Sequence, residues 1–290
     1  MNISSQTSDS VKLYLWPSGA PGALGSAEED KPSITIYFPE KNKKSEGAVL
    51  ICPGGGYVAL ALNHEGWQVA KWYNAQGMTA AILRYRLGTW DHKKYKHPTM
   101  LTDAKRAMRL LRSKAKEYAL NPEKIGVMGF SAGGHLASCL STMYDGGNPA
   151  HNDPVEKVSC RPTFAVLVYP VISMSSKHTF DFSRGVLLGD LADPKLNDSM
   201  STEKRITPLT PPTFLVHAYD DGVKVENSLM YFAALREQNV PAEIHIYERG
   251  GHGYGMYPQK TRDNPNPERI ADWPERLKNW LRNRGGLVVD

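Results

Sequence analysis

One serine in the chain lies in a setting typical of a nucleophile. Ser131 is the middle residue of the Gly-Phe-Ser-Ala-Gly segment 129–133, which overlaps the apolar run from Ile125 to Phe130. The pattern G-x-S-x-G predicts a sharp turn from a buried strand into a helix, on which the serine hydroxyl stands clear of the sheet. Glycines leave room for the backbone at such a turn. Because the pattern is short and also fits an ordinary loop, the rest of the chain must decide whether it is catalytic.

A serine hydroxyl is a weak nucleophile at neutral pH, so it needs a base and an acid that orients that base. His252 is the candidate base, because it lies in a glycine-rich loop directly after the last predicted strand. Asp220 and Asp221 follow another predicted strand, and the spacing to Ser131 does not separate them as candidates for the acid. Either choice gives the chain order serine, acid, histidine.

The negative charge that develops on an attacked carbonyl oxygen needs hydrogen-bond donors. Gly55 and Gly56 belong to a glycine triplet after the apolar run 48–52, where glycine lets backbone N–H groups approach a substrate closely. Ala132 begins the predicted helix after Ser131, so its N–H is expected to be unpaired and to point at the same oxygen. The triplet also fits a simple turn, but it lacks the spacing and the lysine of phosphate-binding loops.

Apolar runs alternate with amphipathic segments, which predicts an α/β fold with a mostly parallel sheet and helices on both faces. The predicted strands are 11–16, 34–38, 48–52, 79–85, 125–130, 164–171, 213–218 and 243–247, of which the first two are expected to be antiparallel edge strands. The predicted helices are 65–76, 102–118, 133–144, 228–238 and 275–284. Because ligands bind at the carboxyl ends of parallel strands, the candidate residues should converge on one rim of the sheet.

Length and composition limit the classes of protein that fit. The 290 residues, 41% of them hydrophobic, are expected to form one domain, residues 1–290. The net charge of +5 is modest and both signs are interleaved, so no nucleic-acid partner is expected. No apolar run of about 18 residues occurs, so no contact with a membrane is expected. The three cysteines fit no zinc motif and are expected to be buried free thiols, and no metal or cofactor is expected.

The first ten residues are polar and lack the basic and apolar regions of a secretion signal. This predicts a cytoplasmic protein, with a periplasmic or secreted protein whose signal has been removed as the alternative. The sequence gives no indication of the oligomeric state.

With these motifs in place, the chain resembles the α/β-hydrolase superfamily. Within it, the chain is similar to bacterial acetylxylan esterases and bifunctional feruloyl and acetyl xylan esterases. The resemblance extends over nearly the whole chain. It is carried by the segments 15–17, 19–21, 52–57, 64–66, 84–87, 129–137, 159–162, 169–171, 220–228 and 250–253.

The resemblance implies a role for individual residues. Ser131 matches the nucleophile of these enzymes and His252 matches the base. Their acid turn usually has an aspartate followed three residues later by a valine; since Val223 stands here, this implies Asp220 as the acid, with Asp221 as the second choice. The implied oxyanion hole consists of Gly55, Gly56 and Ala132.

The resemblance also bears on how the substrate reaches the site. Relatives of the hormone-sensitive-lipase type carry a sizeable N-terminal cap, whereas fewer than 50 residues precede the first buried strand here. An open site is therefore expected, and the segment 173–212 is a hypothetical partial lid. Aromatic side chains at the rim could stack on a sugar ring or a feruloyl group, or could equally pack against loops. The candidate substrate-binding residues are Tyr57, Trp90 and Tyr254, with Tyr95 nearby.

The favoured hypothesis is a serine esterase that removes acetyl groups from xylan or related saccharides, with a small-molecule or polysaccharide ester as substrate. The first alternative is a feruloyl esterase or an esterase of broad small-ester specificity. A peptidase or an arylformamidase would use the same three side chains, although peptidases of this type usually add a second domain. A non-catalytic carbohydrate-binding protein on the same fold is disfavoured, because no member of the expected triad is missing.

Overall fold

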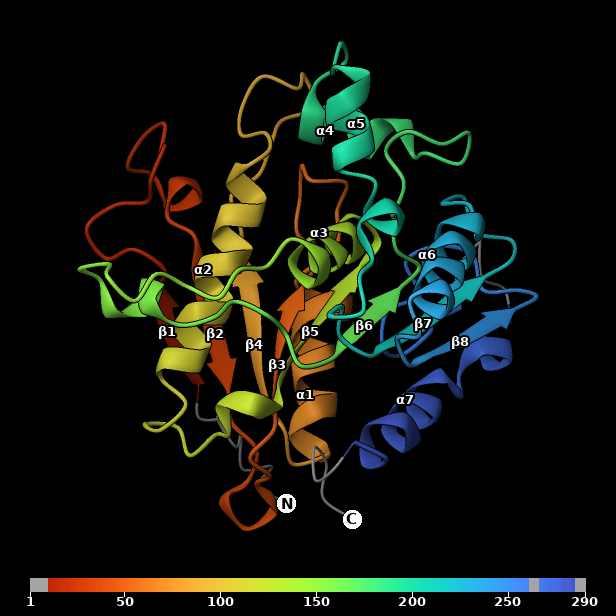
Figure 1. The fold of residues 1–290 in the computed structure, drawn as a ribbon. Helices are drawn as coiled ribbons and strands as arrows, with labels where there is room; N and C mark the ends of the chain where they lie inside the picture. The colour runs from red at the N-terminus through yellow and green to blue at the C-terminus, as the bar shows by residue number, and fades with distance from the viewer. Residues whose placement is uncertain (1–9, 261–265, 285–290) are drawn as a thin grey trace.

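The computed structural model describes residues 10–260 and 266–284 (Figure 1). The polar residues 1–9, on which the expectation about a secretion signal rests, lie outside the described residues. Eight strands form one sheet in the order β1-β2-β4-β3-β5-β6-β7-β8. β1 and β2 are antiparallel to their neighbours, and all the other neighbouring strands pair in parallel. The predicted fold class is therefore confirmed.

All eight predicted strands are present, and three of them have the predicted bounds. The strands are β1 Ser10–Tyr14, β2 Ser33–Tyr37, β3 Ala48–Cys52, β4 Thr79–Arg84, β5 Ile125–Phe130, β6 Ala165–Val168, β7 Thr213–Ala218 and β8 Ala242–Tyr247. The three with the predicted bounds are β3, β5 and β7, and every residue in them is buried. A strand covered on both faces reads as an unbroken apolar run, which makes its ends easy to find in a sequence.

The helices follow the prediction with shifted ends, and two were not predicted. They are α1 Gln68–Ala75, α2 Thr99–Ser113, α3 Ser131–Thr142, α4 Asp181–Leu188, α5 Pro194–Ser199, α6 Glu226–Glu237 and α7 Trp273–Arg282. α1 begins after a π-helical turn, Asn63–Trp67, and α2 ends before a turn in which Ala119 has a φ of 49°. α4 and α5 have eight and six residues, too few to show a helical period in the sequence.

Two apolar cores lie on the two faces of the sheet. Helices α2, α3 and α6 cover one face, and α1 and α7 cover the other (Figure 1). Cys52, Cys139 and Cys160 are buried free thiols, as expected. The double covering leaves the ends of the strands as the place where polar side chains can gather.

A buried ion pair between Arg86 and Asp103 connects the loop after β4 to α2. The Nη2 atom of Arg86 lies 2.6 Å from Oδ1 of Asp103, and both side chains are almost completely excluded from solvent. Arg86 also donates from Nη1 to the carbonyl oxygen of Pro21 at 2.7 Å. The pair therefore links the N-terminal loop, the loop after β4 and α2.

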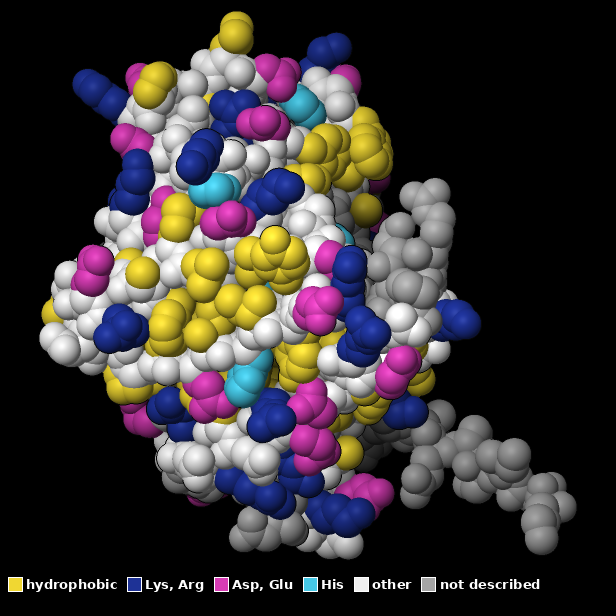
Figure 2. Space-filling model, turned by 90° about the vertical axis from the view of Figure 1, so that its right-hand side faces the viewer, with side chains coloured by type: hydrophobic (Ala, Val, Ile, Leu, Met, Phe, Trp, Pro, Cys, Tyr) yellow, Lys and Arg dark blue, Asp and Glu magenta, His cyan; other side chains and the backbone are white. Residues whose placement is uncertain are grey.

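Figure 2 shows the side of the molecule that carries edge strand β8 and helices α6 and α7. Basic and acidic side chains are interspersed on this face, and hydrophobic side chains gather near its middle. Among the exposed large hydrophobic residues are Leu229 of α6 and Ile246 of β8. In the part of the chain that the structure describes, no helix has the length and apolar character needed to cross a bilayer.

The buried pair generates a prediction about stability. Asp103→Ala leaves the Arg86 guanidinium buried without a counter-ion, so we expect a loss of about 3–5 kcal/mol in the free energy of unfolding. Urea denaturation followed by circular dichroism measures this loss. The exposed pair Lys114–Glu117 provides the control, because Lys114→Ala should change the free energy by less than about 1 kcal/mol. Equal effects of the two substitutions would contradict the assigned role of Asp103.

Candidate active site

Ser131 lies on the sharp turn that the sequence predicts. It is the first residue of α3, directly after β5, and its φ is +51°. A positive φ is uncommon and strained for a residue with a side chain. A Cβ atom on Gly129 would lie 2.1 Å from the carbonyl oxygen of Gly133, and a Cβ on Gly133 would lie 2.1 Å from the carbonyl oxygen of Cys52. Only glycine fits at these two positions, so the turn depends on both.

The structure brings His252 to Ser131. His252 Nε2 lies 2.8 Å from Ser131 Oγ, while Nδ1 lies 2.8 and 2.9 Å from the two carboxylate oxygens of Asp221. An ionised carboxylate only accepts hydrogen bonds, so Nδ1 carries the proton and Nε2 is free to accept the proton of Ser131. The side chain of His252 is 34% exposed, which makes this edge of the site reachable from solvent, as expected for an open site.

The structure corrects the choice of Asp220 as the acid. Asp220 Oδ1 accepts hydrogen bonds from the backbone N–H groups of Gly250 and Gly251, both at 2.9 Å, and so fixes the start of the loop that carries His252. The side chain of Asp221 is the one that contacts the His252 ring. Neighbouring residues in the turn after β7 point in different directions, so the spacing to Val223 does not identify the residue that faces the histidine.

Asp221 is held in its ionised form by its surroundings. Burial alone raises the pKa of this carboxyl, but the side chains of His217 and His252 outweigh burial and bring the pKa below its ordinary value. The backbone N–H of Val223 also donates to Asp221 Oδ1 at 2.7 Å. His217 is buried in β7 and lies 2.8 Å from the Ser228 hydroxyl and 2.9 Å from the Val223 carbonyl, so it is packed and hydrogen-bonded. An ionised Asp221 can stabilise the imidazolium that forms when His252 takes a proton.

The glycine triplet lies against the serine. A Cβ atom on Gly54 would lie 2.9 Å from Ser131 Cβ. Gly55 and Gly56 have φ angles of +131° and +63°, and their N–H groups donate to no acceptor among residues 10–260 and 266–284. The N–H of Ala132, in the first turn of α3, has no acceptor within its helix. The three predicted oxyanion donors thus remain available for an oxygen bound next to Ser131.

The side chain of Tyr57 is buried beneath the protein surface and is not exposed to substrate. Its side chain is fully buried, and its hydroxyl lies 2.8 Å from Nδ1 of His135. His135 Nε2 donates to the carbonyl oxygen of Met200 at 2.8 Å, so Nδ1 accepts from Tyr57. Burial lowers the pKa of His135 to about 4, which keeps the ring neutral. The prediction that the Tyr57 side chain binds substrate is therefore wrong.

Tyr254 and Tyr95 are also packed rather than open to substrate. Tyr254 is buried against the rings of Tyr169 and Trp273, at centroid distances of 4.4 and 6.5 Å. Tyr95 is buried and donates its hydroxyl hydrogen to Asp30. The suggestion that these two tyrosines stack on substrate is wrong, because their ring faces are covered by the protein itself.

Trp90 is the exception among the aromatic candidates. Its side chain is 75% exposed, and its ring centroid lies 5.0 Å from that of Phe182 in α4. A Cβ atom on Gly56 would lie 2.6 Å from the Phe182 ring, so Phe182 packs against the glycine loop. Helices α4 and α5 lie beyond the carboxyl ends of the central strands (Figure 1). The segment 173–212 therefore covers part of the site, in line with the partial lid that the sequence suggests.

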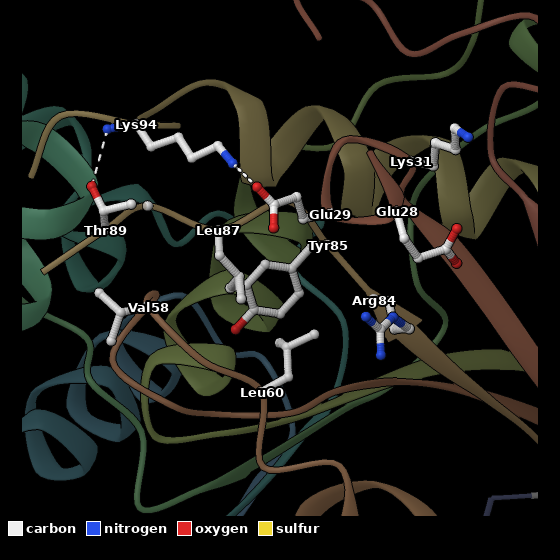
Figure 3. Close-up of a pocket in the computed structure, with 11 residues that line it drawn as sticks. Glu28, Glu29, Lys31, Val58, Leu60, Arg84, Tyr85, Leu87, Thr89 and Lys94 are labelled. Atoms are coloured by element: carbon white, nitrogen blue, oxygen red, sulfur yellow. Dashed lines mark hydrogen bonds and ion pairs between the residues drawn. The ribbon is translucent and has the colours of Figure 1, made fainter. Parts of the chain in front are cut away.

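A cavity of about 250 Å³ lies beside the segment that continues the glycine loop (Figure 3). Val58 and Leu60 of this loop line it together with Leu87, and Lys94 at its rim is paired with Glu29. Val58 is two residues beyond Gly56, so their Cα atoms are at most about 7.6 Å apart. Thr89, the residue before Trp90, also lines this cavity.

The two adjacent aspartates allow a matched test of the acid. Asp221→Asn leaves the geometry almost unchanged but favours the wrong tautomer of His252, so kcat should fall by about 10³- to 10⁴-fold. Asp220→Asn keeps a carbonyl oxygen for the two glycine N–H groups, so kcat should fall by less than about tenfold. Steady-state hydrolysis of 4-nitrophenyl acetate measures both effects. The reverse order of the two variants would contradict the geometry described above.

Comparison with known proteins shows where the chain belongs. The family model described as BD-FAE matches residues 34–235. An acetylxylan esterase of Xylanibacter ruminicola is 35% identical over 238 residues, which cover 80% of this chain and 46% of that protein. Endo-1,4-beta-xylanase B of Butyrivibrio fibrisolvens is 34% identical over 227 residues, which cover 77% of this chain and 34% of that protein. The chain spans less than half the length of these two relatives.

Solved structures agree with the family match. An acetyl ester-xyloside bifunctional hydrolase from Caldicellulosiruptor lactoaceticus superimposes with a TM-score of 0.86 at 38% identity, covering 96% of this chain and 97% of that one. The carboxylesterase Cest-2923 from Lactobacillus plantarum, at 21% identity and a TM-score of 0.75, shows the same fold. The predicted resemblance to α/β-hydrolase esterases is confirmed, and this chain belongs to the BD-FAE family.

Proposed function

We propose that this chain is a serine carboxylic ester hydrolase that removes acetyl groups from xylan or a related saccharide. The observation that carries the proposal is the hydrogen-bonded series from Ser131 through His252 to Asp221, next to the unpaired N–H groups of the glycine loop. The acetylxylan esterase and the acetyl ester-xyloside hydrolase among its relatives support an acetyl ester on a xylose-based saccharide.

In the first half of the reaction, Ser131 Oγ attacks the carbonyl carbon of the ester. His252 Nε2 takes the hydroxyl proton, and Asp221 stabilises the resulting imidazolium. The carbonyl oxygen becomes negative and accepts hydrogen bonds from N–H groups of the glycine loop and of Ala132. Each such donor is typically worth about 10²- to 10³-fold in rate.

In the second half, the saccharide leaves and the enzyme is regenerated. His252 gives its proton to the departing sugar oxygen as the bond to the acyl carbon breaks, which leaves an acetyl group on Ser131. A water molecule then attacks this acyl group, and His252 accepts one of its protons and returns it to Ser131. The products are acetate and the deacetylated saccharide, and no other reactant is consumed.

A feruloyl ester is the second candidate substrate, because the exposed ring of Trp90 next to Phe182 offers an apolar face to an aromatic acyl group as well as to a sugar. An esterase of broad small-ester specificity would use the same residues. For a saccharide, the surface from Trp90 to the cavity in Figure 3 is the proposed path of the sugar chain away from Ser131.

The proposed reaction is tested by acetate release from acetylated xylan, measured beside hydrolysis of 4-nitrophenyl acetate and methyl ferulate. Ser131→Ala should lower acetate release by at least about 10³-fold, because the acyl-enzyme can no longer form. Ser141→Ala is a matched control on the same helix, since within residues 10–260 and 266–284 the Ser141 hydroxyl bonds only to the carbonyl oxygen of Ala137. If Ser131→Ala released acetate at the wild-type rate, the proposed function would be wrong.

The proposed sugar path gives a second prediction. Trp90→Ala should raise KM for acetylated xylo-oligosaccharides by about threefold to tenfold, which corresponds to a stacking contribution of about 0.5–1.5 kcal/mol. Because 4-nitrophenyl acetate carries no sugar ring to stack on Trp90, its KM should stay within twofold of the wild-type value. This path would be ruled out if KM rose equally for both substrates, or if KM changed for neither of them.

A further inference from the structure

A buried carboxylate outside the triad lies behind the active site. Glu65, in the π-helical turn Asn63–Trp67, is only 3% exposed. Its pKa is raised by burial, and this effect is opposed by nearby histidines and by the hydrogen bonds that the carboxylate accepts. A carboxylate is costly to bury unless its oxygens are satisfied. π-Helical turns are rare and frequently occur at functional sites. The groups that donate hydrogen bonds to Glu65 therefore indicate its role.

Both oxygens of Glu65 accept hydrogen bonds from the two loops that build the site. Oε2 lies 2.7 Å from the N–H of Gly54, the first residue of the glycine loop. Oε1 lies 2.9 Å from the hydroxyl of Tyr169, which directly follows β6. The same hydroxyl accepts from the N–H of Gly255 at 3.0 Å, in the loop that carries His252. One continuous series of hydrogen bonds thus joins the loop of the oxyanion donors to the loop of the base.

The direction of each hydrogen bond is fixed by chemistry. The N–H groups of Gly54 and Gly255 can only donate, so the Tyr169 oxygen accepts from Gly255 and its hydrogen must point at Glu65. Glu65 therefore has to accept at both oxygens, which an ionised carboxylate does and an amide does not. Tyr169 also contacts the triad directly, because its ring centroid lies 4.9 Å from that of His252. Its φ of +37° shows that the backbone is strained to place it there.

We propose that Glu65 and Tyr169 are positioning residues, which set the separation between the oxyanion donors and the base. The transition state needs Gly55 and Gly56 at the oxyanion at the same time as His252 at Ser131. These groups follow different strands, β3 and β8, and the Glu65–Tyr169 pair is a buried side-chain link between their loops. A displacement of about 1 Å between reacting groups can cost about 10²-fold in rate. This role rests on the proposed esterase function, because it acts through the same triad.

Two nearly isosteric substitutions test this role. Glu65→Gln removes one acceptor, and Tyr169→Phe removes the hydroxyl that joins the two loops. Each should lower kcat for 4-nitrophenyl acetate by about 10- to 100-fold, with KM within about threefold of wild type. Because both residues belong to one series, the double variant should be no more than about twofold slower than the slower single variant.

Tyr73→Phe is the matched control for Tyr169→Phe. Tyr73 is fully buried in the same core, and its hydroxyl lies 3.3 Å from the sulfur of Met128, apart from the triad. It should keep the wild-type kcat, which shows that loss of a buried tyrosine hydroxyl in this core does not by itself slow the reaction. If Glu65→Gln does not fold, Tyr169→Phe and its control still decide the matter.

Three results would overturn the proposal: wild-type kcat in folded Tyr169→Phe, the same loss of kcat in Tyr73→Phe, or losses that multiply in the double variant. Failure of the underlying function is recognised separately, since Ser131→Ala would then be as active as the wild type. Ser131-dependent hydrolysis that is indifferent to Tyr169 would leave the esterase intact and remove the positioning role.

Discussion

The site depends on the close approach of three pieces of backbone where β5 turns into α3. The backbone at Gly133 lies so near the carbonyl oxygen of Cys52, and the backbone at Gly129 so near that of Gly133, that neither position has room for a Cβ atom. This contact brings the end of β3 against the start of α3 and leaves Ser131 with a positive φ. It therefore places the serine oxygen, the helix N-terminus and the glycine triplet together, before any side-chain interaction is considered.

The parts of the site that the sequence predicts are those fixed by local backbone rules. The turn at Ser131 needs small residues at set spacings, and the parallel sheet brings the ends of its strands to one edge. These two rules suffice to place Ser131, the glycine triplet and His252 together, although His252 is 121 positions from Ser131. The buried strands are equally predictable, because covering on both faces leaves an unbroken apolar run such as Ala48–Cys52.

The parts that the sequence does not predict depend on side-chain direction and on contacts between distant segments. Asp220 and Asp221 differ by one position, and only the path of the turn decides which one faces His252. The burial of Tyr57 depends on His135, and the exposure of Trp90 beside Phe182 depends on where the short helix α4 lies. Glu65 and Tyr169, which are 104 positions apart, belong to motifs that the resemblance singles out, but no spacing rule connects them.

The central claim is that catalysis passes through a covalent intermediate on Ser131. The most direct measurement is peptide mass spectrometry after reaction with diethyl 4-nitrophenyl phosphate, whose phosphoryl group forms a stable adduct with an activated serine. The account predicts one adduct per chain, located on Ser131, with loss of esterase activity in proportion to labelling and no adduct in Ser131→Ala. Ester hydrolysis that persists after complete labelling of Ser131, or an inactivating adduct on another residue, would contradict it.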